Sequence, residues 1–266
     1  MKVYLYSFSL LFKASFQYRF NTIIELLFQN VNVLITILFW LLIFRSGNQA
    51  AIRSYTVGDI TTYFIVSNVF RNFIIMNSGW AYAAQIKSGD ISPKLLKPYK
   101  YNLLVYFQHL AAAITGAVPN VILVSIALPA LHVLVTLNVS AVNALFVLLF
   151  LVLSTITSHL VWSILGYLSF WTEEGYAIMW SFMVLFNLIS GAFIPLEFFP
   201  EWSVKALMCL PTATWGYMPA KAFVGGLELR RLLFYFWINV AWCVILIIIQ
   251  RLTWRRGTKK YSSVGG

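Results

Sequence analysis

The sequence predicts an all-α membrane protein with a single transmembrane domain over residues 1–266. Hydrophobic residues make up 61% of the chain and charged residues only 10%, whereas soluble domains carry roughly 25% charged residues. A membrane span needs about 20 apolar residues, and six segments of the chain are apolar over about that length. Because backbone groups in hydrocarbon must be paired within their own segment, we expect these segments to be helices.

The six predicted spans follow an amphipathic N-terminal stretch. They cover residues 23–44, 60–84, 103–126, 142–170, 176–194 and 232–250. In residues 1–21, polar side chains recur at steps of three and four, which predicts a helix lying along the inner membrane surface. The alternative is an early extension of the first span, in which Lys13 and Arg19 would have to snorkel out of hydrocarbon.

The chain has a net charge of +11, and its lysines and arginines lie mainly at the ends of the spans. The positive-inside rule explains this distribution better than nucleic-acid binding does. With both termini inside, twelve cations are cytoplasmic and six are outside, and Arg71 completes the nineteen. The pair Arg230 and Arg231 before the last span argues for the opposite orientation. The inner group is Lys2, Lys13, Arg19, Lys87, Lys94, Lys97, Lys100, Arg251, Arg255, Arg256, Lys259 and Lys260, and the outer group is Arg45, Arg53, Lys205, Lys221, Arg230 and Arg231.

Residues 85–101 form a basic, proline-bracketed stretch between two apolar segments. On the cytoplasmic side, such a stretch is a place where a soluble partner could act on the membrane part. We predict a short helix with Ser92 as its N-cap and Pro93 in its first turn, ending near Pro98.

A line of polar residues follows one face of the first predicted span. Its members are Thr22, Glu25, Gln29, Asn32 and Thr36. Unpartnered polar groups are costly in an apolar medium, so this face should meet another helix, a second subunit or a wet cavity. The line therefore indicates either polar contacts between helices or the border of a translocation route.

Arg71 lies about twelve residues into the second predicted span, where an arginine costs roughly 2.5 to 3.5 kcal/mol on insertion scales. No acidic residue is expected at the same depth. Its partner could be backbone carbonyls, a neighbouring subunit, anionic lipid or a substrate.

The fifth predicted span carries a stripe of Met179, Phe182, Met183 and Phe186, followed by Asn187. Such a soft apolar surface could accommodate ligands of variable shape, or it could be ordinary packing. Residues 195–231 are apolar but broken by prolines, which predicts short helices dipping into the outer leaflet.

The chain shows no catalytic or metal-binding pattern. It lacks a Gly-x-x-x-x-Gly-Lys-Ser/Thr phosphate loop and any cluster of carboxylates, histidines or cysteines spaced for chemistry. Its two cysteines, Cys209 and Cys243, indicate no disulfide framework.

The order of these features resembles the permease subunit of type-2 ATP-binding cassette exporters, in a branch of paired permeases. The resemblance rests on the N-terminal amphipathic helix, the six spans and three short motifs. The motifs are Ser190-Gly191-x-Phe193-x-Pro195-Leu196, Ile86-Lys87-Ser88-Gly89-Asp90-Ile91 with Leu95-Leu96-Lys97-Pro98, and Phe170-Trp171-Thr172-Glu173-Glu174.

This resemblance implies export of a hydrophobic or amphipathic substrate, such as a drug, antibiotic, peptide or lipid, across the bacterial inner membrane. Two separate ATPase subunits, which would bind ATP and magnesium, would drive two permeases that are identical or homologous. The ATPase would bind Leu95 and Leu96, with Lys94 and Lys97 at the rim. Further implied contacts are Lys87, Asp90, Pro93, Glu173 and Glu174, and plain helix capping is the alternative for the two glutamates.

Two other classes fit the sequence less well. An ion-coupled secondary transporter typically shows internal repeats and several deep charges, and we find no convincing repeat. A membrane-embedded enzyme acting on lipid needs convergent acids and bases, but Glu25, Arg71 and His159 are dispersed along the chain.

Overall fold

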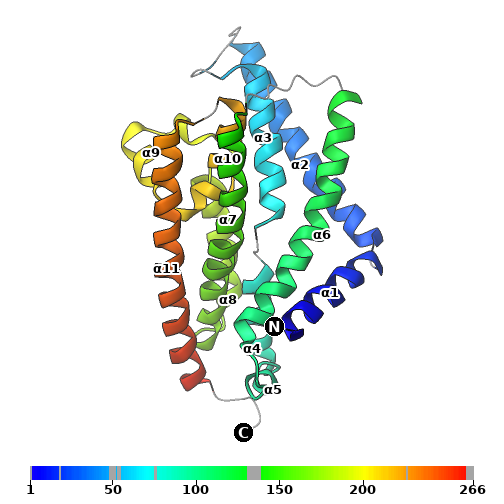
Figure 1. The fold of residues 1–266 in the computed structure, drawn as a ribbon, viewed down its shortest axis with the longest axis vertical. Helices are drawn as coiled ribbons and strands as arrows, with labels where there is room; N and C mark the ends of the chain where they lie inside the picture. Colours follow the sequence, from blue (N-terminus) through cyan, green and yellow to red (C-terminus); the bar gives the residue numbers. More distant parts are fainter. Residues whose placement is uncertain are drawn as a thin grey trace.

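The computed structural model describes residues 2–17, 19–47, 52, 55–74, 77–130, 139–225 and 227–261. All regular elements in these ranges are helices, which confirms the all-α fold class. The helices form an elongated bundle in which α6 is tilted away from the centre (Figure 1). The start of α1 and the end of α11 lie in the same half of the molecule as α4 and α5 (Figure 1).

The elements follow one another in the order of the predicted segments. The first half contains α1 (Lys2–Gln17), α2 (Arg19–Ser46), α3 (Val57–Asn72), α4 (Asn77–Ser88), α5 (Ser92–Leu95) and α6 (Tyr101–Ala130). The second half contains α7 (Ala141–Tyr167), η1 (Leu168–Phe170), α8 (Gly175–Ile189), η2 (Leu196–Phe198), α9 (Glu201–Met208), η3 (Pro211–Trp215), α10 (Tyr217–Val224) and α11 (Leu229–Lys260).

Three helical stretches are long and apolar enough to cross a membrane. They are Tyr101–Ser125, Ala141–Phe170 and Leu229–Lys260. Two shorter apolar helices, Asn30–Ser46 and Gly175–Ile189, accompany them. The structure thus supports a membrane protein by the length and composition of its helices.

The N-terminal stretch is a separate helix. Helix α1 ends at Gln17 and runs in a different direction from α2 (Figure 1). It packs along α6, where the ring of Tyr4 stacks on Phe107 at 6.0 Å and Gln108 donates a hydrogen bond to the Ser7 hydroxyl. Its position on a membrane surface stays a prediction.

The second predicted span is not one continuous helix, and this expectation was wrong. Helix α3 ends at Asn72 and α4 begins at Asn77. Asn77, Ser78 and Gly79 favour helix starts over helix interiors, which explains a new beginning at this point. Helix α3 packs mainly against α10, α2 and α6, whereas α4 packs mainly against α7, η1 and α8 and touches α6 as well, so most neighbours of the two pieces differ.

The start of α3 follows from local sequence. The Thr56 hydroxyl accepts a hydrogen bond from the backbone of Asp59, and the Asp59 carboxylate accepts one from the backbone of Thr56. This capping box satisfies two amide groups that the first turn of a helix leaves unpaired.

Between residues 196 and 224 the chain forms short helical pieces, as the prolines predicted, whereas residues 229–231 at the end of the predicted segment already belong to α11. They enter the bundle more deeply than expected, because residues 211–220 are all buried. The indole of Trp215 donates to the Thr157 hydroxyl at 2.9 Å, and the Ser154 hydroxyl donates to the carbonyl of Thr214 at 2.9 Å. This segment is therefore part of the core beside α7.

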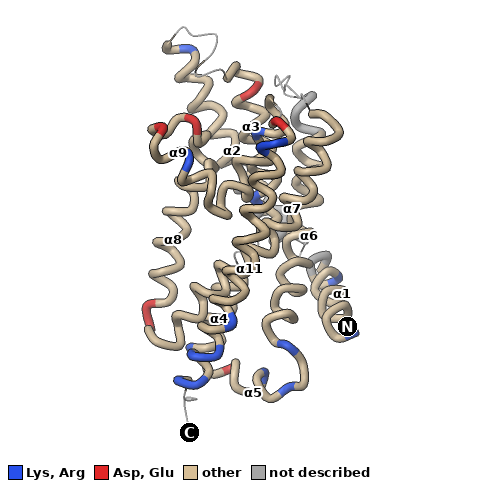
Figure 2. The backbone as a smooth tube through the Cα atoms, turned by 60° about the vertical axis from the view of Figure 1, so that its left-hand side comes forward, with Lys and Arg blue, Asp and Glu red and all other residues tan. Residues whose placement is uncertain are grey.

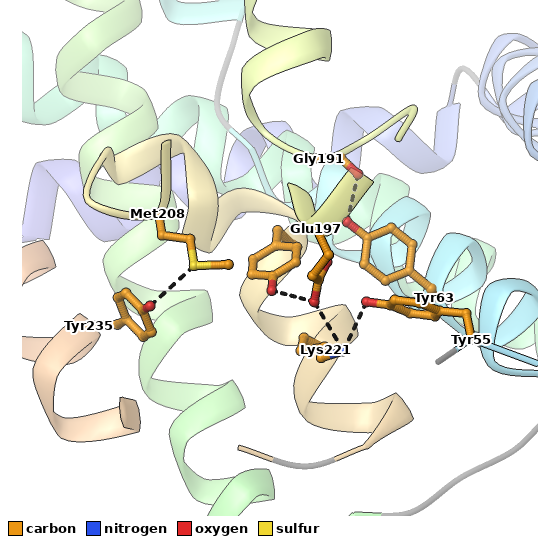
Figure 3. A network of polar contacts seen from close by, with 8 residues as sticks. Tyr55, Tyr63, Gly191, Glu197, Met208, Lys221 and Tyr235 are labelled. Atoms are coloured by element: carbon orange, nitrogen blue, oxygen red, sulfur yellow. Dashed lines mark hydrogen bonds and ion pairs between the residues drawn. The ribbon is translucent and has the colours of Figure 1, made fainter. Parts of the chain in front are cut away.

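A polar network, which the sequence did not reveal, joins this segment to the chain before α3 (Figure 3). Lys221 forms an ion pair with Glu197 at 3.0 Å and donates to the Tyr55 hydroxyl at 3.1 Å. Tyr217 donates to the same carboxylate at 2.6 Å, and Tyr63 donates to the carbonyl of Gly191 at 2.7 Å. Burial and the nearby Glu197 charge raise the pKa of Tyr55 above its usual value, so it stays a neutral phenol.

We expect Glu197→Gln to destabilise the protein by about 1 to 3 kcal/mol, because it leaves a partly buried Lys221 without its counter-charge. Thermal unfolding of the detergent-solubilised protein would measure this. Glu201→Gln, at an exposed position in the first turn of α9, is the matched control. Equal melting temperatures for the two variants would contradict the role assigned to the ion pair.

Candidate functional site

Residues 85–101, hereafter the docking segment, connect α4 to α6 at one end of the molecule. Lysines and arginines outnumber the acidic residues at this end, whereas the two signs of charge are more evenly mixed at the opposite end (Figure 2). Gly89 turns the chain with a φ of 84°, a left-handed conformation that favours glycine. After the turn, the amide of Ile91 donates to the carbonyl of Gln85 at 3.2 Å, so the segment folds back on α4.

An aromatic cluster supports the docking segment from inside. It consists of Tyr82, Tyr101, Tyr167, Phe170 and Trp254. The ring of Tyr167 lies 4.7 Å from Tyr82 and 4.9 Å from Trp254, and such pairs contribute about 0.5 to 1.5 kcal/mol beyond their buried area. Ile91 is fully buried in the same core. The docking segment is therefore attached at once to α4, α6, α7 and α11.

The prediction of Ser92 as the N-cap of the short helix was wrong. The N-cap of α5 is Ile91, and no side chain caps the helix. Because the Ile91 side chain is buried in the core, the turn begins there and Ser92 becomes the first helical residue. The Ser92 hydroxyl instead donates to the Tyr261 hydroxyl at 3.4 Å. Pro93 lies in the first turn and α5 ends before Pro98, as predicted.

The outer face of the docking segment presents apolar side chains to solvent. Leu95 is 38% exposed and Leu96 is 87% exposed. Full burial of a leucine is worth roughly 1.5 to 3 kcal/mol, so covering this pair would be favourable. Lys97 is exposed beside them, whereas Lys94 lies over the Tyr101 ring at 5.9 Å. Burial lowers the pKa of Lys94 below its usual value, and the Asp90 carboxylate opposes this shift.

The other predicted coupling residues are also accessible. Lys87, Asp90 and Pro93 are exposed, and the Ser88 hydroxyl donates to the Asp90 carboxylate at 2.7 Å. Glu173 and Glu174 are exposed before α8, and Glu174 occupies the N-cap position without a side-chain capping bond. The capping alternative for Glu174 is thus not realised.

Helix α4 connects the docking segment to α7 through a very close crossing. A Cβ atom at Gly166 would lie 2.5 Å from the carbonyl oxygen of Gly79, and one at Gly79 would lie 2.5 Å from the carbonyl oxygen of Trp162. No other residue than glycine fits without moving the two backbones. The two helices therefore behave as one packed unit at this level.

Two of the predicted translocation residues whose side chains the structure describes, Asn32 and Thr36, lie on α2. The amide of Asn32 donates to the carbonyl of Phe28, and the Thr36 hydroxyl donates to the carbonyl of Asn32. Asn32 is exposed and Thr36 partly exposed, so this face does not pack against another described helix of the chain. The side chains of Glu25 and Gln29 lie outside the described residues.

A polar contact of α2 that the sequence did not reveal lies on a different face. Asn30 donates to the side-chain oxygen of Asn120 on α6 at 3.0 Å. Asn30 shares its helical face with Val33, Ile37 and Trp40, which pack into the core. The apolar spacing of three and four from Asn30 onward was the signal that could have found it.

Arg71 lies in the last turn of α3 and is partly buried. A cation is favoured near the carbonyl end of a helix, which gives Arg71 a structural reason to be there. No ion pair or hydrogen bond links its guanidinium to another residue in the part of the chain that the structure describes. The group is thus available to an anionic partner.

The apolar stripe of α8 faces α4 and α7. Met179 and Phe186 are buried, and the Phe182 ring meets Trp162 edge-on at 5.5 Å. Met183 is partly buried in the same cluster. Asn187 is buried and its side-chain oxygen has no hydrogen-bond partner among the described residues. In this conformation the stripe packs between helices.

We expect Gly166→Ala to destabilise the protein by about 1 to 3 kcal/mol, because its methyl group would overlap the α4 backbone. Gly116→Ala is the matched control, since a Cβ atom there meets nothing within 4 Å and alanine is the better helix former. Melting temperatures in detergent should fall for Gly166→Ala and not for Gly116→Ala. Similar effects of both would show that the two helices do not touch as described.

Comparison with known families agrees with the sequence-based resemblance. Residues 30–265 match the family model described as ABC-2 family transporter protein. The match begins within α2 and includes the docking segment, the aromatic cluster and the network around Glu197. No curated protein matches the chain at a significant level.

Proposed function

Because the chain belongs to the ABC-2 transporter family, we propose that it is the permease subunit of an exporter driven by separate ATPase subunits. The docking segment is the place where the ATPase binds. The observation that carries this proposal is the exposed pair Leu95 and Leu96 on a turn that the aromatic cluster holds firmly from inside. An apolar contact surrounded by lysines fits a protein interface with a buried centre and a polar rim.

The proposed topology has six crossings of a bacterial plasma membrane. They are formed by α2, α3 with α4, α6, α7, α8 and α11. Both termini and the docking segment face the cytoplasm, because the end of the molecule around α5 is dominated by lysine and arginine (Figure 2). Arg230 and Arg231 at the other end of α11 reduce this bias without reversing it.

The split of the second predicted span suggests how force would travel. A push on the docking segment reaches α4 first, and the Gly79–Gly166 crossing passes it to α7. Helix α3 packs instead with α10, α2 and α6, and α7 also contacts α10 and η3, so α7 would pass the movement on to the outer part of the permease. Movement of one such part relative to the other is what alternating access to a substrate site requires.

The complex would contain two permeases and two ATPases. The exposed Asn32 and the partly exposed Thr36 on α2 fit a contact with the second permease, which is identical or homologous. ATP and magnesium would bind to the ATPase subunits, since no phosphate-binding loop occurs in this sequence.

The proposed substrate is hydrophobic or amphipathic. The guanidinium of Arg71, which bonds to no residue that the structure describes, supports contact with a polar or anionic part of the substrate at the inner end of α3. The stripe of α8 would meet the apolar part if α4 and α8 separate during transport. Glu25 and Gln29 complete the proposed pathway along α2.

We expect the double variant Leu95→Asp and Leu96→Asp to lose co-purification with the ATPase while the permease stays folded. The reason is that two charges replace the apolar centre of the contact. Leu229→Asp, an exposed leucine at the opposite end of the molecule, serves as control. Affinity purification in mild detergent followed by mass spectrometry measures the association, and undiminished recovery of the ATPase would remove the docking proposal.

We expect Arg71→Leu to reduce transport by tenfold or more with little change in the amount of folded protein. Loss of one charge-assisted contact, worth about 1.5 to 3 kcal/mol, accounts for this factor. Arg71→Lys, which keeps the charge, should retain part of the activity. Efflux of a panel of amphipathic dyes from cells measures transport, and wild-type efflux by Arg71→Leu would leave Arg71 a purely structural role.

A further inference from the structure

The last three turns of α11 carry a group of exposed cations. The group consists of Arg251, Arg255, Arg256, Lys259 and Lys260. None of them forms an ion pair in the part of the chain that the structure describes. Like charges on one short surface repel each other, and an acidic partner would relieve that repulsion. We call this group the α11 basic surface.

The helix end that bears this surface is fixed in place. Trp254, Gly257 and Tyr261 recur at steps of three and four and face inward, so the cations fall on the outward face. Gly257 is buried against the Phe170 ring so tightly that a Cβ atom there would overlap it. Tyr261 accepts from the Ser92 hydroxyl of α5. The surface therefore rests on the same aromatic cluster as the docking segment.

The depth of the surface argues for a protein partner over lipid. The apolar run of α11 ends at Ile249, and Lys259 follows ten residues later, which is about 15 Å along a helix. The polar headgroup layer adds only about 5 to 8 Å to each side of the hydrocarbon core. Lys259 and Lys260 thus lie beyond the headgroups, at the level of α5. Topology anchoring explains the sign of these charges, but it gives no purpose to their fixed place on a helix end that contacts the docking segment through Tyr261 and Ser92.

We propose that the α11 basic surface is a second contact for the ATPase that binds the docking segment, and that this ATPase presents an acidic patch beside the pocket for Leu95 and Leu96. The inference rests on the proposed function. The two leucines supply an apolar centre, whereas the cations orient the ATPase and speed its association, as charges at the rim of an interface do.

Two neutralising variants test the inference. The first, Lys259→Gln with Lys260→Gln, leaves Arg251, Arg255 and Arg256 to anchor the topology. The second adds Arg255→Gln and Arg256→Gln. Arg230→Gln with Arg231→Gln is the matched control, because it removes two cations from the outer end of the same helix. Binding of the purified variants to the ATPase that co-purifies with the wild-type permease is measured in detergent at about 0.05 and 0.3 M salt, where screening lengths differ.

We expect the double variant to bind the ATPase about threefold more weakly than the wild type. The quadruple variant should bind at least about tenfold more weakly, mainly because it associates more slowly. Wild-type binding should weaken at the higher salt, and the quadruple variant should lose most of that dependence. The control should match the wild type. Wild-type affinity that is the same at both salt concentrations would overturn the inference even if the variants failed to fold.

The remaining outcomes separate the inference from the proposed function. If the quadruple variant binds like the wild type while the Leu95→Asp and Leu96→Asp variant does not bind, the inference fails and the docking proposal stands. If neither set of changes affects binding, both fail. If ATPase binding is unchanged but co-sedimentation with phosphatidylglycerol vesicles falls, the surface binds lipid, and the inference is again overturned.

Discussion

The backbones of α4 and α7 touch at Gly79 and Gly166, and much of the remaining architecture depends on this contact. It brings the end of α4 over α7, which places Tyr82 against Tyr167 and begins the aromatic cluster. It also leaves room for Met179 of α8 beside Gly79. Neither backbone can move at this point without breaking its contact with the other. The docking segment is therefore attached to the bundle by close packing and not by a flexible connection.

Above and below this contact, different forces hold the molecule together. At the end of the molecule opposite the docking segment, the partly buried Glu197 and Lys221 pair joins the short helices between residues 196 and 224 to the chain before α3. Beside the docking segment, aromatic side chains from four helices pack together, and no ion pair among the described residues joins them. Helix α7 contacts elements of both parts. This helix therefore links the part held by the ion pair to the part held by aromatic packing.

Sequence reasoning predicted the exposed residues of the candidate site better than the buried residues that hold them in place. Leu95, Leu96 and Lys97 stood out because they are short-range features between two apolar segments, and the structure places them on the surface. Trp254 and Tyr261 could not be connected with them, because more than 150 residues separate α5 from the end of α11 in sequence. Whether Ser92 or Ile91 begins α5 likewise depended on the burial of Ile91 in a core that distant residues form.

The amino-acid sequence alone indicated that the chain lies in a membrane, because composition and hydropathy are sums over the chain. It also determined the all-α fold class, because each apolar segment pairs its own backbone groups in hydrocarbon by forming a helix. It also determined local boundaries, such as the capping box of Thr56 and Asp59. Only the tertiary structure decided that the second span divides between Asn72 and Asn77, and which polar groups pair across the bundle. Contacts such as Asn30 with Asn120, or Tyr55 with Lys221, depend on how distant segments of the chain pack together, and no periodicity within one helix specifies that.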